Sequence, residues 1–194
     1  GYTQLIPLPQ TARGTVTVDV AAKVATDAAG NNNTAAVQAS QVFDSRTSIE
    51  LSDVAQGKGG FVIYGENEYD GSGHSVSYAG DVNGDGIDDL IIGAPYADPN
   101  GKGSGSSYVV FGKKDKVDFI NLYDINFVSG GFAIHGENGE PEIDGHTSGP
   151  GDYSGYPVSS AGDVNGDGFS DLIISAVGAN NYTGSTYVVF GKTS

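Results

Sequence analysis

One nine-residue stretch decides the fold of this chain: Asp81-Val82-Asn83-Gly84-Asp85-Gly86-Ile87-Asp88-Asp89. It returns almost unchanged as Asp163-Val164-Asn165-Gly166-Asp167-Gly168-Phe169-Ser170-Asp171. Both copies place carboxylate or amide oxygens at positions 1, 3, 5 and 9 and glycine at position 6. Because Ca²⁺ takes about 6 to 8 oxygen ligands, each stretch has the composition of a calcium cage.

The predicted ligands of both loops are side-chain oxygens plus one backbone carbonyl, which Ile87 and Phe169 would supply at position 7. They are Asp81, Asn83, Asp85, Ile87 and Asp89 in the first loop, and Asp163, Asn165, Asp167, Phe169 and Asp171 in the second. Closely spaced carboxylates repel one another unless a cation neutralises them. A metal-free turn is the alternative, since turns also favour Asp, Asn and Gly. The identical offsets in two copies favour calcium, with two Ca²⁺ sites per chain.

The loops are not EF-hands, although the first half of the pattern is the same. An EF-hand needs a bidentate Glu at position 12 and a helix on each side. Position 12 is Ile92 or Ile174, inside short apolar runs that are typical of buried strands. Each loop is therefore predicted to connect two strands.

The repeat extends beyond the loops into two units, residues 45–115 and 116–194. Each unit contains four short apolar runs separated by Gly-rich turns, so we predict an all-β protein with four-stranded antiparallel units. The predicted strands are Phe61–Tyr64, Ser75–Ala79, Leu90–Gly93 and Tyr108–Phe111, then Ala133–His135, Val158–Ala161, Leu172–Ser175 and Tyr187–Phe190.

The motifs of the first unit resemble an FG-GAP repeat, the repeat of integrin α-subunit propellers and their bacterial relatives. They run from Gly73-His74-Ser75-Val76 to Gly80-Asp81, continue in Ile92-Gly93-Ala94-Pro95, and end in Tyr108-Val109-Val110-Phe111-Gly112. The resemblance implies two propeller blades, with Ca²⁺ bound between two strands of each. The second unit departs from the pattern at Ser175-Ala176-Val177-Gly178 and carries an insertion, Glu140 to Tyr156.

Residues 1–44 differ in kind and resemble the C-terminal part of the bacterial Ig-like domains of giant secreted adhesins. Gly14–Val20 alternates with period two, and a turn-rich link leads to a second strand, Ala36–Phe43. About three strands are too few for a sandwich of about seven, and two blades are too few for a propeller of about 4 to 8. We expect a fragment of a large secreted bacterial protein, or a homo-oligomer in which several chains complete a propeller.

Composition narrows the partners and the location. The chain has 9 Lys and Arg against 24 Asp and Glu, a formal charge of −15, which argues against nucleic acid. No run is long and apolar enough for membrane insertion, and there is no cysteine for a disulfide or a thiol nucleophile. Because calcium is abundant outside cells, we expect an extracellular protein, secreted or on the cell surface.

No enzyme is expected, because the three histidines lie at unrelated offsets and no nucleophile motif is present. Tyr153 and Tyr156, in the insertion, are candidate ligand contacts, although a plain surface insertion fits equally well. The predicted function is a calcium-binding adhesion or binding module for a cell-surface protein or carbohydrate. The alternatives are a propeller domain of a polysaccharide-active enzyme and a lectin-type propeller, which would show aromatic platforms between blades.

Overall fold

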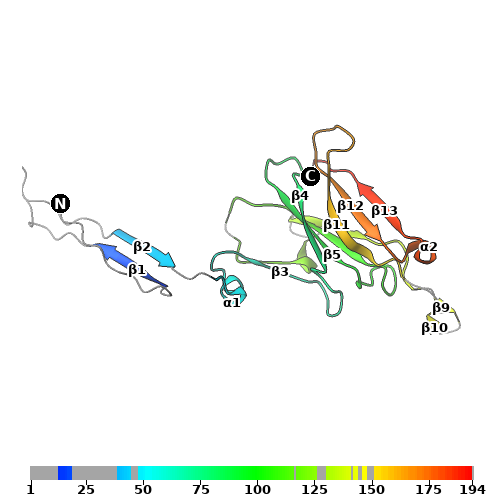
Figure 1. Cartoon of the computed structure of the whole chain (residues 1–194), viewed down its shortest axis with the longest axis horizontal. Helices are drawn as coiled ribbons and strands as arrows, with labels where there is room; N and C mark the ends of the chain where they lie inside the picture. Colours follow the sequence, from blue (N-terminus) through cyan, green and yellow to red (C-terminus); the bar gives the residue numbers. More distant parts are fainter. Residues whose placement is uncertain are drawn as a thin grey trace, which may run out of the picture. The chain divides into compact units, whose positions relative to one another are not determined.

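The computed structural model describes residues 13–18, 39–44, 48–115, 117–125, 130–140, 142–143, 146–147 and 151–193. The chain divides into two compact units, Gly1–Leu51 and Ser52–Ser194. In the first, β1 (Arg13–Val18) and β2 (Ala39–Asp44) pair antiparallel (Figure 1). β1 and β2 fall within the two predicted runs or extend them by one residue, and residues 19–20 and 36–38 of those runs lie outside the described residues. The likeness of residues 1–44 to an Ig-like domain stays a prediction.

The second unit contains two antiparallel sheets. The first sheet has the order β4 (Ser75–Gly80), β5 (Asp89–Ala94), β6 (Ser106–Val110), β8 (Gly131–His135). The second sheet has the order β11 (Ser154–Gly162), β12 (Asp171–Ala176), β13 (Ser185–Val189). Helical turns are confined to α1 (Leu51–Val54), η1 (Leu122–Asp124) and α2 (Ala179–Tyr182) among the residues described. The predicted all-β class is confirmed.

The structure differs from the sequence prediction in the first strand of each predicted repeat, residues 45–115 and 116–194. The run predicted to open the second repeat, Ala133–His135, lies in β8 and pairs with β6 as the fourth strand of the first sheet. The run predicted to open the first repeat forms β3 (Val62–Tyr64), which pairs in parallel with β7 (Phe119–Asn121), outside that sheet. The edge of β6 leaves backbone groups that need partners, and the nearest strand in space supplies them rather than the nearest in sequence.

Two short strands of the insertion pair antiparallel. They are β9 (Glu142–Ile143) and β10 (His146–Thr147), with His146 opposite Ile143.

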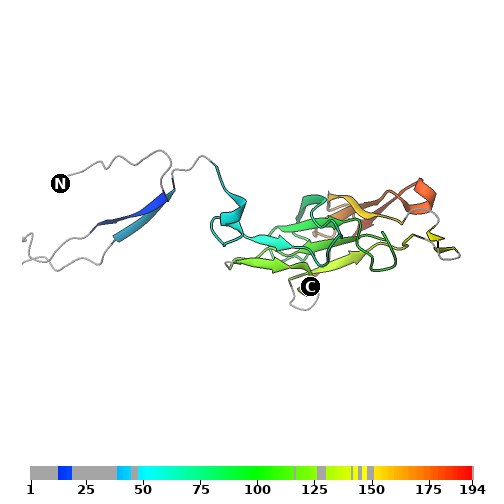
Figure 2. The same cartoon turned by 90° about the horizontal axis from the view of Figure 1, so that it is seen from below.

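The main core lies between the two sheets, where β11 runs alongside β4 and β5 in both views (Figures 1 and 2). Its buried side chains come from both sheets: Ala79, Val82, Ile91, Val109, Val158, Leu172 and Ile174. A second core covers the other face of the first sheet with side chains around η1, including Leu122 and Ile125. All five residues of β6 are consequently buried.

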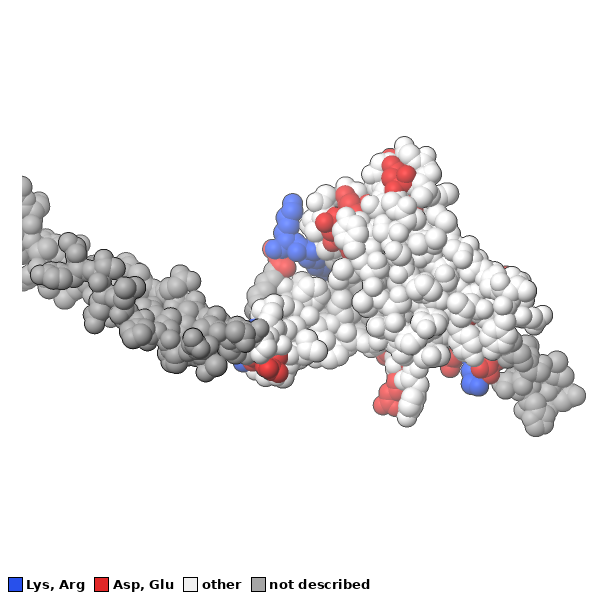
Figure 3. Space-filling view, in the orientation of Figure 1, with Lys and Arg blue, Asp and Glu red and all other residues white. Residues whose placement is uncertain are grey.

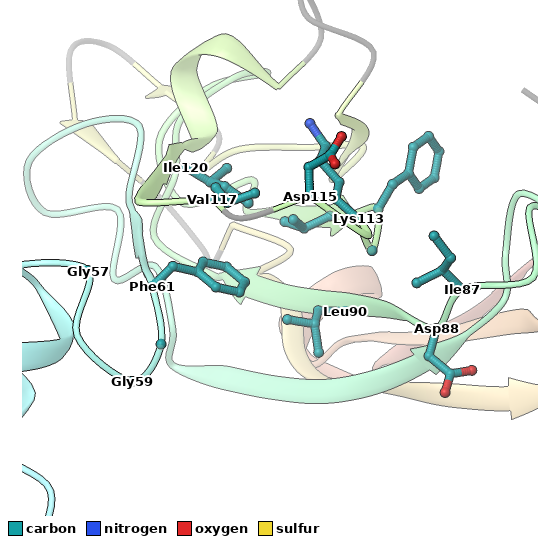
Figure 4. Close-up of a pocket in the computed structure, with 14 residues that line it drawn as sticks. Gly57, Gly59, Phe61, Ile87, Asp88, Leu90, Lys113, Asp115, Val117 and Ile120 are labelled. Carbon is teal, nitrogen blue, oxygen red and sulfur yellow. The ribbon is translucent and has the colours of Figure 1, made fainter. Parts of the chain in front are cut away.

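An apolar pocket of about 510 Å³ opens on that second face of the first sheet (Figure 4). Phe61, Leu90 and Ile120 line it, and Ile87 reaches it from the first Asp-rich loop. This face therefore keeps apolar surface beyond what η1 and β7 cover.

Gly93, the glycine of the Gly-Ala-Pro motif, is required by close packing between the two sheets. A Cβ on Gly93 would overlap the carbonyl oxygen of Gly155, because β11 passes directly against β5 at this point. The equivalent residue of the second sheet is Ser175, which is half-buried. Among the described residues, no third sheet packs against the second sheet at Ser175 as β11 packs against Gly93. A side chain is therefore tolerated at this position of the second sheet.

Candidate metal centre

The first loop (Asp81–Asp89) connects β4 to β5 and is wrapped around the carboxylate of its first residue. Asp81 Oδ1 accepts the N–H groups of Gly84 at 2.7 Å and Asp85 at 3.1 Å, and Oδ2 accepts that of Gly86 at 2.9 Å. Gly84 and Gly86 have φ of 78° and 81°, the left-handed region that glycine adopts without strain. These two glycines turn the backbone N–H groups inward.

The side chains at positions 3 and 5 of the first loop lie against each other. Asn83 Nδ2 donates to Asp85 Oδ2 at 3.2 Å, Asn83 Oδ1 accepts from Asp85 N at 3.0 Å, and Asp85 Oδ1 accepts from Ile87 N at 2.8 Å. The oxygens of three predicted ligands therefore lie within one loop of a few residues.

The second loop (Asp163–Asp171) connects β11 to β12 and repeats this network. Asp163 accepts the N–H groups of Gly166 at 2.7 Å, Asp167 at 3.1 Å and Gly168 at 2.9 Å. Positions 3 and 5 again contact, with Asn165 Nδ2 donating to Asp167 Oδ2 at 2.8 Å. The two loops thus share one local geometry, as their sequences predict.

Position 9 closes each loop with a fully buried carboxylate. Asp89 accepts Val82 N and Gly112 N, each at 2.9 Å, and Asp171 accepts Val164 N at 2.8 Å and Gly191 N at 2.9 Å. Both side chains are 0% exposed. Burial raises the pKa of Asp89, while the two N–H donors act in the opposite direction. Each carboxylate ties the loop to the strand beyond it.

The predicted ligands fit a hard cation, because all of them are oxygen atoms and not all of them come from acidic side chains. No three acidic, histidine or cysteine side chains converge as a metal cluster within the described ranges. The predicted set, however, includes an Asn amide and a backbone carbonyl, and a carboxylate has about four acceptor sites. After the hydrogen bonds above, Asp81, Asn83, Asp85 and Asp89 each retain acceptor capacity. No Lys or Arg forms an ion pair with these acids in the described part of the chain.

The two loops also contact each other. Ser170 N donates to the carbonyl of Asp81 at 3.0 Å, and Lys192 N donates to that of Val82 at 3.0 Å. The Phe169 ring lies over Gly84, where an added Cβ would overlap it. Gly166, the equivalent of Gly84 in the second loop, has nothing within 4 Å of the same position.

The glycine that follows the last strand of each repeat packs against a loop. A Cβ on Gly112 would overlap the Asp88 carbonyl oxygen, and one on Gly191 would lie 2.5 Å from the Ser170 carbonyl oxygen. A glycine is therefore needed at the end of each repeat, where the chain passes the Asp-rich loop.

The remaining candidates lie at the opposite end of the sheets. Tyr153 and Tyr156 are at the start of β11, and they meet His74 and Tyr96 of the first sheet's turns, which sequence reasoning did not single out. His74 precedes β4 and Tyr96 follows β5, so only the antiparallel pairing of β4 with β5 brings them to one end. Residues this far apart in sequence leave no spacing signal.

Acidic side chains from the loop between β3 and β4 line a separate pocket of about 310 Å³. Glu66, Glu68 and Asp70 line it with Asp98 and Tyr108. Tyr108 Oη donates to Glu66 Oε2 at 2.7 Å, and burial together with this bond raises the pKa of Tyr108. Burial likewise raises the pKa of Asp70. Glu140 forms an ion pair with Lys102 at 2.7 Å. Glu66, Asp70, Asp98 and Glu140 thus each have a polar partner.

Charge is sparse on the face shown in Figure 3. Red acidic groups gather in separate patches at the ends of the sheets, and most of the surface between them is uncharged. In the described part of the chain, no helix has the length and hydropathy needed to cross a membrane.

The sheets and their loops define a class of protein: a repeat protein built from β-propeller blades with Asp-rich loops between adjacent strands. The family model for the FG-GAP repeat matches residues 72–110 and 156–189. The first match begins just before β4 and ends at the last residue of β6, and the second begins within β11 and ends at the last residue of β13. The chain therefore carries two FG-GAP repeats.

Curated relatives include integrin alpha chains. The chain is 37% identical to integrin alpha pat-2 of Caenorhabditis elegans over 42% of its own length and 8% of the worm protein. It is 33% identical to integrin alpha-PS5 of Drosophila melanogaster over 55% of its length and 9% of that protein. A phosphatidylinositol-glycan-specific phospholipase D of Dictyostelium discoideum is 30% identical over 67% of the chain and 13% of that protein. The chain thus spans a small part of each relative.

Proposed function

We propose that this chain is a calcium-stabilised, non-catalytic adhesion or binding module of an extracellular or cell-surface protein. The observation that carries the proposal is the network shared by the two loops, in which three backbone N–H groups hold the carboxylate of position 1 and a buried Asp closes the loop. In this proposal Ca²⁺ supplies the positive charge that the loop acids otherwise lack.

The family match and the integrin alpha relatives support the adhesion class. The same sources support an extracellular or cell-surface location, because the chain is similar to proteins named integrin alpha. The relative named as a phospholipase D is 30% identical over 13% of its length, so it favours shared repeats over a shared reaction.

Calcium binding would act by stabilisation. A ligand that binds only the folded state stabilises it by RT ln(1 + [L]/Kd), about 2.7 kcal/mol per site when the ligand is at about 100 times Kd. Each ion would join the loop carboxylates to the start of β5 or β12, whose first residues are the buried Asp89 and Asp171.

The direct test is calorimetric titration of the chelator-treated chain with Ca²⁺, combined with thermal unfolding. We expect two sites, and a melting temperature that falls when the chelator is added. Asp85→Ala and Asp167→Ala should each leave one site. Asp88→Ala is the matched control, because Asp88 is exposed and accepts only the Tyr78 hydroxyl at 3.0 Å. A chain with no calcium-dependent heat and no change in melting temperature would contradict the proposal.

We also propose that the outer face of the second sheet packs against a further blade, from a longer chain or from a second copy that completes a propeller. Val188 and Phe190 are 47% and 56% exposed there, whereas Val109, the equivalent of Val188, is 0% exposed. Mass from light scattering in calcium distinguishes the sources: a cyclic oligomer indicates second copies, and a monomer indicates a blade supplied by a longer chain.

A further inference from the structure

Four aromatic rings meet at the seam between the two sheets, at the end opposite the Asp-rich loops. His74 and Tyr96 come from the turns of the first sheet, and Tyr153 and Tyr156 from the start of β11. The ring centroids of His74 and Tyr156 are 4.6 Å apart and stacked, those of His74 and Tyr96 are 5.6 Å apart, and those of Tyr96 and Tyr153 are 6.1 Å apart. We call this set the ring cluster.

Tyr153 is the structural member of the ring cluster. Its ring is packed against Gly103 of the first sheet's turn and Gly178 of the second, at 2.8 Å and 3.0 Å from the Cβ positions that these glycines lack. Its hydroxyl donates to Glu140 Oε1 at 3.2 Å, and Lys102 holds the other oxygen of Glu140 at 2.7 Å. Burial raises the pKa of Tyr153. Tyr153 therefore closes the seam between the sheets and fixes a polar edge beside Tyr96.

The other three rings of the cluster, those of His74, Tyr96 and Tyr156, are exposed to solvent. Tyr96 and Tyr156 are 51% and 45% exposed, and His74 is exposed as well. They are nevertheless held in place: Tyr96 lies over Gly71, 2.8 Å from its missing Cβ, and Tyr156 is stacked on His74. A rigid aromatic surface loses little conformational entropy on binding, which is the property that makes tyrosine common in recognition surfaces.

We propose that Tyr96, Tyr156 and His74 form a binding platform for a neutral hexopyranose of a glycan, a specificity that rests on the adhesion function proposed above. One face of such a sugar presents C–H groups that pack on the electron-rich face of an aromatic ring. Its hydroxyl groups need hydrogen-bond partners, and the Glu140–Lys102 pair at the Tyr153 hydroxyl keeps an acceptor site and donors for them. The platform lies at the seam between the two sheets, with rings contributed by both.

Size and charge favour this ligand over the other classes. A stable protein partner buries about 800 Å² per side, more than three rings provide, whereas one sugar ring matches the cluster. The formal charge of −15 and the neighbouring carboxylate of Glu140 disfavour acidic sugars. A neutral sugar stacked on so few side chains is expected to bind with a Kd of about 1 mM.

The test is saturation-transfer NMR and calorimetry on the calcium-loaded chain with methyl β-galactoside, methyl α-glucoside, lactose and cellobiose, with sialyllactose as the acidic comparison. We expect at least one neutral sugar to bind and sialyllactose to bind more weakly. Tyr96→Ala and Tyr156→Ala should each reduce affinity at least fivefold. Tyr96→Phe and Tyr156→Phe should retain most of it, because the ring face makes the contact.

Tyr78→Ala is the matched control, since Tyr78 is an equally exposed tyrosine at the other end of β4 and should leave sugar binding unchanged. The calcium-dependent melting temperature of every variant is measured in parallel, so that loss of the fold or of calcium is separated from loss of the sugar. The proposal is overturned if no neutral sugar binds to the calcium-stabilised chain, if the alanine variants bind as well as the parent, or if this surface binds a polypeptide instead.

Discussion

The two sheets have similar strand sequences, yet the first sheet has a hydrophobic core on each face, and the second has one on a single face among the residues described. Val109 of β6 is 0% exposed, whereas Val188, its equivalent on the outer face of β13, is 47% exposed. The strand sequence is therefore suited to burial on both faces, and the presence of a neighbouring sheet decides which residues achieve it. The Asp-rich loops behave differently, because the hydrogen bonds within each loop are the same although, in the described part of the chain, only the first loop accepts further bonds from a neighbouring repeat.

Removing the closing carboxylates should have the largest effect and should be equal in the two sheets. Asp89→Ala leaves Val82 N and Gly112 N without their acceptor, and Asp171→Ala does the same to Val164 N and Gly191 N. Each buried unsatisfied group costs about 1 to 3 kcal/mol, so we expect about 3 kcal/mol or more per variant. Urea unfolding in calcium measures it. A cost confined to Asp89→Ala would mean that the second loop depends on a neighbour after all.

Core truncation should separate the two sheets. Ile91 is 0% exposed between them, so Ile91→Ala is expected to cost about 2 to 5 kcal/mol. Ile173, its half-buried equivalent, should cost about 1 kcal/mol when changed to Ala, because less apolar area is lost from contact. The pair is compared by the same urea unfolding curves. Equal costs would indicate that the outer face of the second sheet is covered in solution.

Exchanging the two residues at the departure from the Gly-Ala-Pro motif tests the close approach of β11. Gly93→Ser would place Cβ against the Gly155 carbonyl and should destabilise the chain by about 1 to 3 kcal/mol. Ser175→Gly should cost about 0.5 to 1 kcal/mol, the ordinary penalty of glycine within a strand. Thermal unfolding of both variants is sufficient. A tolerated Gly93→Ser would contradict the close packing described for β5 and β11.

The smallest expected difference concerns the fourth position of each loop. Gly84 and Gly166 have nearly the same φ, 78° and 76°, so Ala should cost each about 1 kcal/mol of backbone strain. Gly84→Ala must in addition displace the Phe169 ring, whereas Gly166→Ala meets nothing within 4 Å. We expect Gly84→Ala to have the lower melting temperature of the two. The reverse order would indicate that the second loop is the more crowded.

What the sequence could predict follows from how local each feature is. The loop networks depend on residues within nine positions of one another, and the first and second loops were placed correctly between strands. The assignment of β8 and β3 could not be made, because pairing with β6 or β7 depends on contacts across dozens of residues. Of the ring cluster, the sequence analysis named only Tyr153 and Tyr156, which lie in the insertion. His74 and Tyr96 come close to them only because β4 pairs with β5.

The pairing of β8 with β6 also has a mechanical consequence. β8 belongs to the second predicted repeat, which begins after residue 115. Its five residues nevertheless pair with β6 of the first repeat, from Ser106 with His135 to Val110 with Gly131. A load applied along the chain cannot separate the first repeat from the second without breaking this ladder of backbone hydrogen bonds. Neighbouring repeats are thus interlocked, and under tension they would yield as a pair rather than one at a time.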